Sequence, residues 1–306
     1  MPKEGEERGK FKNILLTVMA IVFIVVVILP LTFSVFDASK MGNVARIPIN
    51  GPITGDGSSY LGENTVSSRD IVSFIQEAEQ NSQIKVIILE INSPGGSAVA
   101  SDEIASAVKQ AQKPVMAVIR EVGASGGYWI ASATDHIIAN KMSITGSIGV
   151  ISSYLEFSGL MEKYGVGYER LVAGKYKDVG TPFRELDAAE RTLLQKKLDR
   201  IQEFFIEEIA ANRDLTTTKV ESLATGEFYL GVEALELGLV DELGDMTTAE
   251  NYITEQYGLE KIDYVLYQRE AGLLDLLASV FSDVGFHIGT GIGSIFIQHE
   301  NPLFLV

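Results

Sequence analysis

The stretch KVIILEINSPGGSA, residues 85–98, joins an apolar strand to a glycine turn and the start of a helix. Lys85–Ile91 is almost continuously apolar, which is typical of a parallel strand that is covered on both faces. Gly95 and Gly96 let the backbone approach a ligand closely, and their amides precede a helix predicted over 98–112. By itself the motif fits either an anion-binding turn or an ordinary strand-to-helix connection.

The same alternation of strand and helix continues on both sides of this stretch. Strands are predicted at Val44–Ile49, Pro114–Ile119 and His136–Asn140, and helices at Ser67–Gln80 and directly after Ser125. A long amphipathic helix follows near Asp187, where Asp187 and Glu190 have the spacing of a capping box. Alternation at this spacing predicts an α/β fold built of βαβ units with right-handed crossovers.

A second glycine-flanked turn, GASGGY over Gly123–Tyr128, follows the strand predicted at Pro114–Ile119. It places Ser125 at the start of a helix, similar to the strand–turn–helix arrangement that exposes a nucleophilic serine in hydrolases. The positive end of that helix and the Gly126 amide would stabilise negative charge that develops beside Ser125. Taken alone, Ser125 is equally well explained as a helix N-cap.

A nucleophilic serine needs a base, and the three histidines are poor candidates for it. His136 lies in an apolar strand, where a structural role is favoured, and His287 and His299 lie in the C-terminal tail. A lysine acts as a base once it has lost its proton, and removal from water lowers its pKa from the usual value of about 10.4.

Two lysines in the segment AGKYKD (Ala173–Asp178) are candidates for this role. In an extended chain Lys175 and Lys177 point to the same side, so their spacing does not separate them. For either residue, a solvated surface lysine is the simpler interpretation. Asp178 would oppose the chemistry if it paired with Lys177, because a neighbouring carboxylate raises the pKa of an ammonium group.

The composition excludes several functional classes. The chain of 306 residues contains no cysteine, so it has no thiolate nucleophile, thiolate metal site or disulfide. Its formal net charge of −16 would repel nucleic-acid phosphates, and no nucleic-acid partner is expected. The histidines are scattered along the sequence, so a histidine-based metal cluster is not expected either.

An uncharged segment near the N-terminus predicts a membrane anchor. As a helix, residues 14–36 would span about 35 Å, which exceeds a bilayer core of about 30 Å. The run is longer than that of a cleavable signal peptide and ends in bulky residues, so an uncleaved signal anchor is expected. More lysine and arginine residues precede the span than follow it closely, which predicts a cytoplasmic N-terminus and a catalytic domain outside.

Several motifs, taken in order, give the chain a resemblance to a known family. They are NSPGG (92–96), GASGGYWIA (123–131), TGSIGV (145–150), AGKYKD (173–178) and LELGLVDELG (235–244). In these motifs the chain resembles the membrane-anchored signal peptide peptidases of the SppA type, in their short form with a single catalytic unit. The resemblance implies a Clp-protease/crotonase-like α/β fold of repeated ββα units, preceded by one transmembrane helix.

The resemblance also implies roles for five residues. Ser125 would be the nucleophile and Lys177 the general base of a Ser/Lys dyad. The amides of Gly96 and Gly126 would form the oxyanion hole, and Ser147 would orient the lysine through a hydrogen bond. No metal or cofactor is implied.

Other consequences of the resemblance concern partners and the base. Asp178 is expected to point away from Lys177. The expected partners are peptide substrates such as signal peptides, the membrane, and further copies of the chain. In such a homo-oligomer, Lys177 of one copy could serve the Ser125 of its neighbour.

The sequence thus predicts a polar tail (1–13), a transmembrane signal anchor (14–36), a connector (37–43), a peptidase domain (44–270) and an apolar C-terminal tail (271–306). The expected function is that of a membrane-anchored serine endopeptidase that degrades cleaved signal peptides or other apolar peptides. Three alternatives stay open at this point. They are a membrane-bound Clp-class protease for one membrane partner, a crotonase-type acyl-CoA enzyme, and a non-catalytic scaffold with the same fold.

Overall fold

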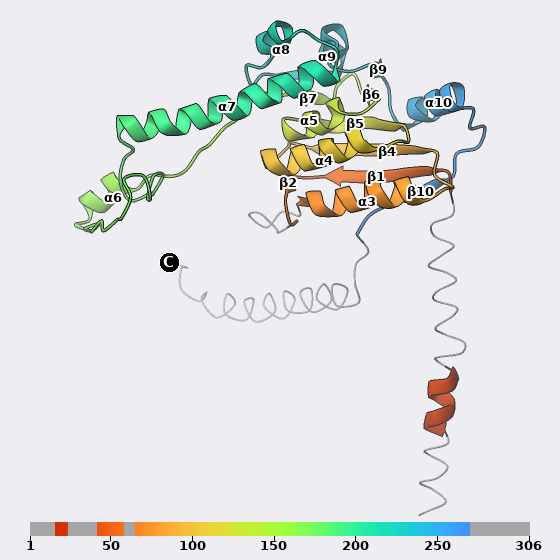
Figure 1. Cartoon of the computed structure of the whole chain (residues 1–306), viewed down its shortest axis with the longest axis horizontal. Helices are drawn as coiled ribbons and strands as arrows, with labels where there is room; N and C mark the ends of the chain where they lie inside the picture. Colours follow the sequence, from red (N-terminus) through yellow and green to blue (C-terminus); the bar gives the residue numbers. More distant parts are fainter. Residues whose placement is uncertain (1–15, 24–41, 58–64, 270–306) are drawn as a thin grey trace, which may run out of the picture. The chain divides into compact units, whose positions relative to one another are not determined.

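The computed structural model describes residues 16–23, 42–57 and 65–269 (Figure 1). The chain divides into two units, residues 1–267 and 268–306, and the first contains all the helices and strands named below. Element labels follow Figure 1.

The first unit is built on an eight-stranded sheet in which parallel pairs predominate. The strands along its main path are β10 (Tyr264–Leu266), β1 (Val44–Asn50), β4 (Val86–Ser93), β5 (Val115–Ala124), β6 (His136–Ala139) and β9 (Glu242–Leu243). Each neighbouring pair on this path is parallel. β7 (Ile144–Gly146) pairs in parallel with the end of β5, and β8 (Phe228–Leu230) runs antiparallel to β7. The predicted α/β class with a largely parallel sheet is therefore confirmed, while the finer description as repeated ββα units stays a prediction.

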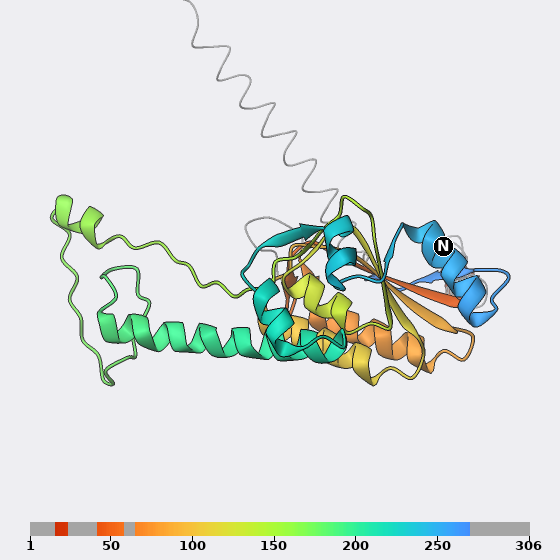
Figure 2. The ribbon, with the colours of Figure 1, turned by 90° about the horizontal axis from the view of Figure 1, so that it is seen from above.

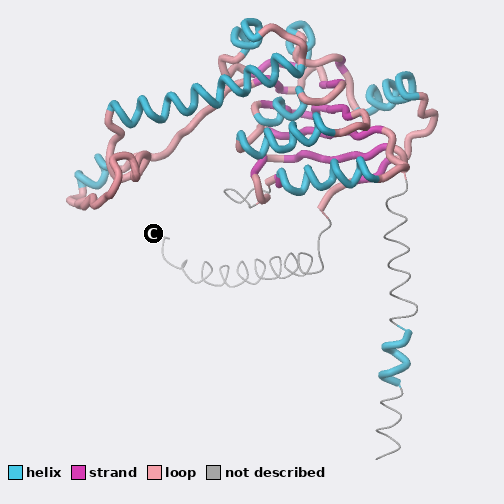
Figure 3. Tube along the Cα trace, in the orientation of Figure 1, coloured by secondary structure: helices cyan, strands magenta, loops and turns pink. Residues whose placement is uncertain are grey.

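A small second sheet and eight helices complete the part of this unit that is described after residue 41. The small sheet pairs β2 (Ile53–Thr54) with β3 (Val66–Ser67). The helices are α3 (Ser68–Gln80), α4 (Ala98–Gln110), α5 (Gly126–Ser132), α6 (Ser158–Lys163), α7 (Ala188–Asn212), α8 (Thr217–Leu223), α9 (Gly231–Leu237) and α10 (Met246–Tyr257). Figure 3 shows α3, α4 and α5 following one another along the sheet.

The residues of β4 show how the sheet is covered on both faces. Ile87 and Leu89 belong to the larger apolar core, which also contains residues of α3, α4 and α5. Val86 and Ile88 point to the opposite face and pack in a second core with residues of α10. Because side chains alternate along a strand, one uninterrupted apolar run can supply both cores.

β5 is longer than the sequence predicted, and its extra length leads directly to the candidate site. The prediction ended at Ile119, whereas the strand continues to Ala124. Residues Met116–Ile119 pair with β6, and residues Val122–Ala124 pair with β7 instead. A change of partner along one strand has no signal in local sequence, which explains why the prediction stopped early.

The segment between β7 and α7 extends away from the sheet, as Figure 2 shows, together with α6 and the first half of α7. We call residues 151–187 the arm. The apolar stripe predicted on α7 divides accordingly. Phe205 and Ile209 are buried in the core, whereas Leu194, Leu198 and Ile201 are half-exposed.

Of the predicted membrane anchor over 14–36, the described residues are 16–23, and they are helical. Within the described ranges, no helix has both the length and the apolar character needed to cross a bilayer. The polar tail over 1–13, the rest of the anchor and the C-terminal tail over 271–306 lie outside the described residues. These segments, and the domain limits, stay predictions.

Candidate active site

Ser125 occupies a strained turn between β5 and α5. Its backbone angles are φ 52° and ψ −123°, in a region that costs a residue with a side chain about 1–3 kcal/mol. Two hydrogen bonds hold the turn. The Ser125 N–H donates to the Gly146 carbonyl at 2.8 Å, and the Ser125 carbonyl accepts from the Trp129 N–H at 2.9 Å. The half-buried Ser125 side chain makes no capping hydrogen bond to α5, which argues against a role only as an N-cap.

Gly95 packs directly against this turn. Its φ is 95°, and a Cβ there would lie 2.6 Å from the Gly126 nitrogen and 2.8 Å from the Ser125 Cβ. Both the backbone conformation and the close approach therefore require glycine. The two glycine motifs identified in the sequence meet at this contact.

Gly96 is held in place by its neighbours and not by its own polar groups. The Ile53 N–H donates to the Gly95 carbonyl at 2.9 Å, and the Ser97 N–H donates to the Ile53 carbonyl at 2.9 Å. These bonds form an isolated parallel bridge between Ile53 and Gly96. Because a parallel bridge uses the residues on either side of Gly96, the N–H and C=O of Gly96 point away from Ile53.

The amides of Gly96 and Gly126 are neighbours at the start of α5. A Cβ on Gly126 would lie 3.3 Å from the Gly96 nitrogen, and it would collide with the Ser101 hydroxyl of α4. Among the described residues, neither amide N–H has a hydrogen-bond acceptor. Two unpaired donors beside a serine, one of them at the positive end of a helix, can stabilise an oxyanion.

Ser147 also has positive φ, at 50°, and directly follows the Gly146 whose carbonyl holds the Ser125 N–H. Its N–H donates to the Glu227 carbonyl at 2.8 Å, and its hydroxyl lies 3.5 Å from the Gly226 carbonyl. The hydroxyl bond is long, so this group is weakly engaged within the chain. The structure thus brings Ser147 next to Ser125.

Lys177 is not brought to this cluster within one chain. It is exposed on the arm, in a turn where its N–H donates to the Gly174 carbonyl at 3.1 Å. Figures 1 and 2 both show the arm running away from the sheet and from α5. Within the described residues, the Lys177 ammonium has no hydrogen-bond or ion-pair partner. The site in one chain therefore consists of Gly96, Ser125, Gly126 and Ser147.

The rival lysine in the same turn is engaged with an aromatic residue. The Lys175 ammonium lies 4.8 Å from the centroid of the Tyr176 ring. A side-chain hydrogen bond to Tyr176 raises the pKa of Lys175 above its usual value. A raised pKa is unfavourable for a base that must lose its proton, which counts against Lys175 in that role.

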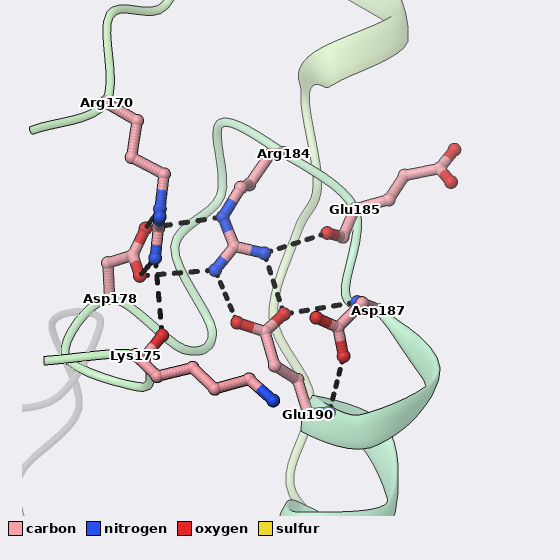
Figure 4. A network of polar contacts seen from close by, with 7 residues as sticks. All are labelled: Arg170, Lys175, Asp178, Arg184, Glu185, Asp187 and Glu190. Atoms are coloured by element: carbon pink, nitrogen blue, oxygen red, sulfur yellow. Dashed lines mark hydrogen bonds and ion pairs between the residues drawn. The ribbon is translucent and has the colours of Figure 1, made fainter. Parts of the chain in front are cut away.

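Asp178 binds two arginines (Figure 4), and within the described residues it makes no ion pair with Lys177. Arg170 contacts both carboxylate oxygens at 2.6 Å, and Arg184 contacts them at 3.3 and 3.2 Å. These bonds, with those from Arg170 contributing most, lower the pKa of Asp178 well below its usual range. Sequence reasoning missed both arginines, because the arm around them has no helical or strand periodicity.

His136 has the structural role that its apolar strand predicted. Its ring stacks on Tyr252 with centroids 3.9 Å apart, and its Nε2 lies 3.3 Å from a Glu242 oxygen. Both partners belong to the far edge of the sheet and its covering helix, not to the elements around Ser125.

The parallel sheet and the serine turn with two free amides define a protein of the Clp-protease-like hydrolase class. The sequence profile of Clp protease matches residues 61–147, and that of Peptidase family S49 matches residues 107–260. The chain belongs to peptidase family S49 and is a serine protease of that family.

Three relatives illustrate the family. A protein described as a protease in Methanocaldococcus jannaschii is 32% identical over 80% of this chain and 78% of its own length. A protein described as the signal peptide peptidase SppA in Enterococcus faecium is 31% identical over 76% of this chain and 69% of its own length. The chloroplastic serine protease SPPA of Arabidopsis thaliana is 30% identical over 79% of this chain and 36% of its own length.

Proposed function

We propose that this chain is a membrane-anchored endopeptidase that hydrolyses apolar peptides, released signal peptides among them, through a dyad of Ser125 and Lys177. The proposal is carried by the strained Ser125 turn beside the unpaired amides of Gly96 and Gly126. The uncharged run over 14–36 supports the anchor, and the name of the Enterococcus faecium relative supports the substrate class.

In the proposed reaction, neutral Lys177 accepts the proton of the Ser125 hydroxyl while the Ser125 Oγ attacks a peptide carbonyl carbon. The Gly96 and Gly126 amides donate to the carbonyl oxygen as it becomes an oxyanion. When the C–N bond breaks, the amine leaves with the proton held by Lys177 and an ester remains on Ser125. Water, deprotonated by the same lysine, then attacks the ester carbon, and as the bond from that carbon to the Ser125 Oγ breaks, the lysine returns the proton to the Oγ and the peptide leaves as an acid.

The base in this scheme comes from a second copy of the chain. The arm that carries Lys177 exposes large apolar side chains, with Ile151 89%, Leu155 72% and Leu171 97% exposed. A set of apolar side chains this exposed is typical of an interaction surface. We therefore propose that the arm of one copy packs on the next and places Lys177 beside the partner's Ser125, where Ser147 orients it.

The proposal is tested by labelling the full-length protein in detergent with a serine-directed diphenyl phosphonate and mapping the adduct by mass spectrometry. We expect an adduct on Ser125 that is lost, together with peptide hydrolysis, in Ser125→Ala. The exposed Ser82, in the turn after α3 and away from the arm, provides a matched control, since Ser82→Ala should keep both. Equal labelling or hydrolysis in wild type and Ser125→Ala would overturn the proposal.

A further inference from the structure

A chain of ion pairs joins the lysine-bearing turn to the beginning of α7 (Figure 4). Asp178 binds Arg170 and Arg184, and Arg184 also binds Glu190 with contacts of 2.7 and 2.5 Å. Glu190 in turn accepts from the Asp187 N–H at 3.1 Å, and Asp187 accepts from the Glu190 N–H at 2.7 Å. The predicted capping box of α7 is thus the fixed end of a longer network.

This network, which joins the arm to α7, contains two carboxylates that are shielded from solvent. The Glu190 side chain is 3% exposed and the Asp178 side chain 17% exposed, although most residues around them are exposed. Residues 165–187 consist of turns and irregular backbone, so no helix or strand fixes the lysine-bearing turn. The bonds from Arg170 and Arg184 supply that constraint, and Arg170 also donates to the Lys175 carbonyl at 3.3 Å.

The position of the Asp178 carboxylate bears on the charge of the proposed base, because Asp178 adjoins Lys177 in sequence. The two arginines make four hydrogen bonds to its two oxygens, which occupies the acceptor sites of the carboxylate. Without them, Asp178 would be a free anion one residue from the proposed base. An unpaired carboxylate beside Lys177 would favour the ammonium, the form that cannot accept a proton.

We propose that Arg170 and Arg184 are positioning residues for the proposed base, which hold the Asp178 carboxylate away from Lys177 and leave the lysine free to reach Ser125. This inference rests on the proposed role of Lys177. It assigns a task to two arginines that do not touch the reacting atoms.

No other charged group around the turn takes the place of the two arginines as a partner of Asp178. Within the described residues, the anions from α7 that face the turn are Glu190 and Asp187, and Glu190 is itself bound by Arg184. Lys175 lies over the ring of Tyr176 and is not paired with Asp178. Arg170 and Arg184 are thus the cations that bind Asp178.

The test compares the pH dependence of kcat in full-length variants with peptide substrate. In Arg170→Gln/Arg184→Gln, we expect the acid limb of the profile to move up by about one pH unit, since an opposite charge nearby shifts a pKa by about one to three units. At a fixed pH on that limb the rate would be about tenfold lower. Adding Asp178→Asn should reverse most of this shift, since only the Glu190 carboxylate then stays without its arginine, and a merely structural role would not give such a rescue.

Two further variants keep the result decisive. Arg170→Gln alone leaves Arg184 bound to Glu190, so it should fold even if the double variant does not, and it should show a smaller shift that Asp178→Asn also removes. A wild-type profile in the arginine variants, or a defect that Asp178→Asn does not suppress, would overturn the inference. Wild-type rates in Lys177→Ala would instead refute the proposed dyad, which separates the two failures.

Discussion

The backbone N–H of Ser125 donates to the Gly146 carbonyl at 2.8 Å, which places Ser125 and Ser147 side by side at the ends of β5 and β7. Both serines have positive φ, 52° and 50°. In the described part of the chain, Asp214 is the only other residue besides glycines that has a positive φ. Strained backbone is thus concentrated at the proposed site, where a rigid arrangement of two hydroxyls has a use.

Two substitutions of Ser147 separate the contribution of its hydroxyl to catalysis from the effect of its positive φ on stability. Ser147→Ala and Ser147→Gly both remove the hydroxyl, and we expect both to lower kcat by about 10- to 100-fold, the equivalent of a hydrogen bond to a charged group. The glycine variant should be the more stable by about 1 kcal/mol, because glycine adopts positive φ without steric cost. Urea unfolding and peptide hydrolysis measure the two effects. Full activity in either variant would refute the orienting role.

Substitution of Gly126 by alanine tests the packing beneath the proposed oxyanion hole. A Cβ at this position would collide with the Ser101 hydroxyl, so Gly126→Ala should destabilise the fold by about 1–3 kcal/mol through overpacking. Ser101→Ala removes the obstructing oxygen and should cost about 1 kcal/mol by itself, since that oxygen bonds the Ser97 carbonyl at 3.0 Å. The double variant should be less destabilised than the sum of the two, whereas strict additivity in urea unfolding would contradict the contact.

The parts of the fold that the sequence predicted are those with local causes. The buried run before Gly95 predicts β4, and the Ser67 hydroxyl that accepts from the Asp70 N–H at 3.3 Å begins α3 where expected. The Asp187–Glu190 capping box likewise begins α7 at the predicted place. Each of these signals lies within a few residues of the feature that it predicts.

The parts that could not be predicted depend on contacts distant in sequence. β10 pairs with β1 at Val44↔Tyr264, and the pairing of β5 changes from β6 to β7, and neither has a local pattern. At the site, the motifs located Ser125 and its neighbouring glycines. The ion pairs that Arg170 and Arg184 make with Asp178 could not be predicted, because they join irregular segments without periodicity. The distance between the arm that carries Lys177 and the Ser125 turn likewise has no local signal, because the arm runs away from the sheet (Figure 2).

Pairing across copies predicts recovery of activity in a mixture of two inactive variants. Ser125→Ala keeps the base and Lys177→Ala keeps the nucleophile, so a neighbouring pair of the two contains one complete dyad. In a randomly mixed cyclic homo-oligomer formed from equal amounts, about one quarter of the proposed sites would be complete, giving about one quarter of the wild-type rate. The measurement is peptide hydrolysis after co-refolding or co-expression.

The control for this mixture is Ser125→Ala combined with the double variant Ser125→Ala/Lys177→Ala, which should stay inactive because no nucleophile is present. Lys175→Ala should keep wild-type activity alone, since its raised pKa suits it poorly as a base. An inactive mixture of chains that still assemble would show that Ser125 and Lys177 do not pair between copies.

The ion-pair network on the arm predicts how stability depends on pH. Arg170 and Arg184 lower the pKa of Asp178, and Arg184 lowers the pKa of Glu190 to about 2. Groups with pKa values lowered by folding stabilise the folded state above their unfolded pKa, about 3.9 for Asp and 4.3 for Glu, and lose this contribution as the pH falls towards the folded values. The urea midpoint of Arg184→Gln should therefore lie below that of wild type by a constant amount from pH 8 to about pH 5, and the two midpoints should converge as the pH falls below about 4.

Arg200→Gln is the matched control, because the Arg200–Glu203 pair on α7 is more than half exposed and should contribute little at any pH. A deficit in Arg184→Gln that is as large at pH 3.5 as at pH 7 would mean that Arg184 stabilises the arm through packing and not through its charge.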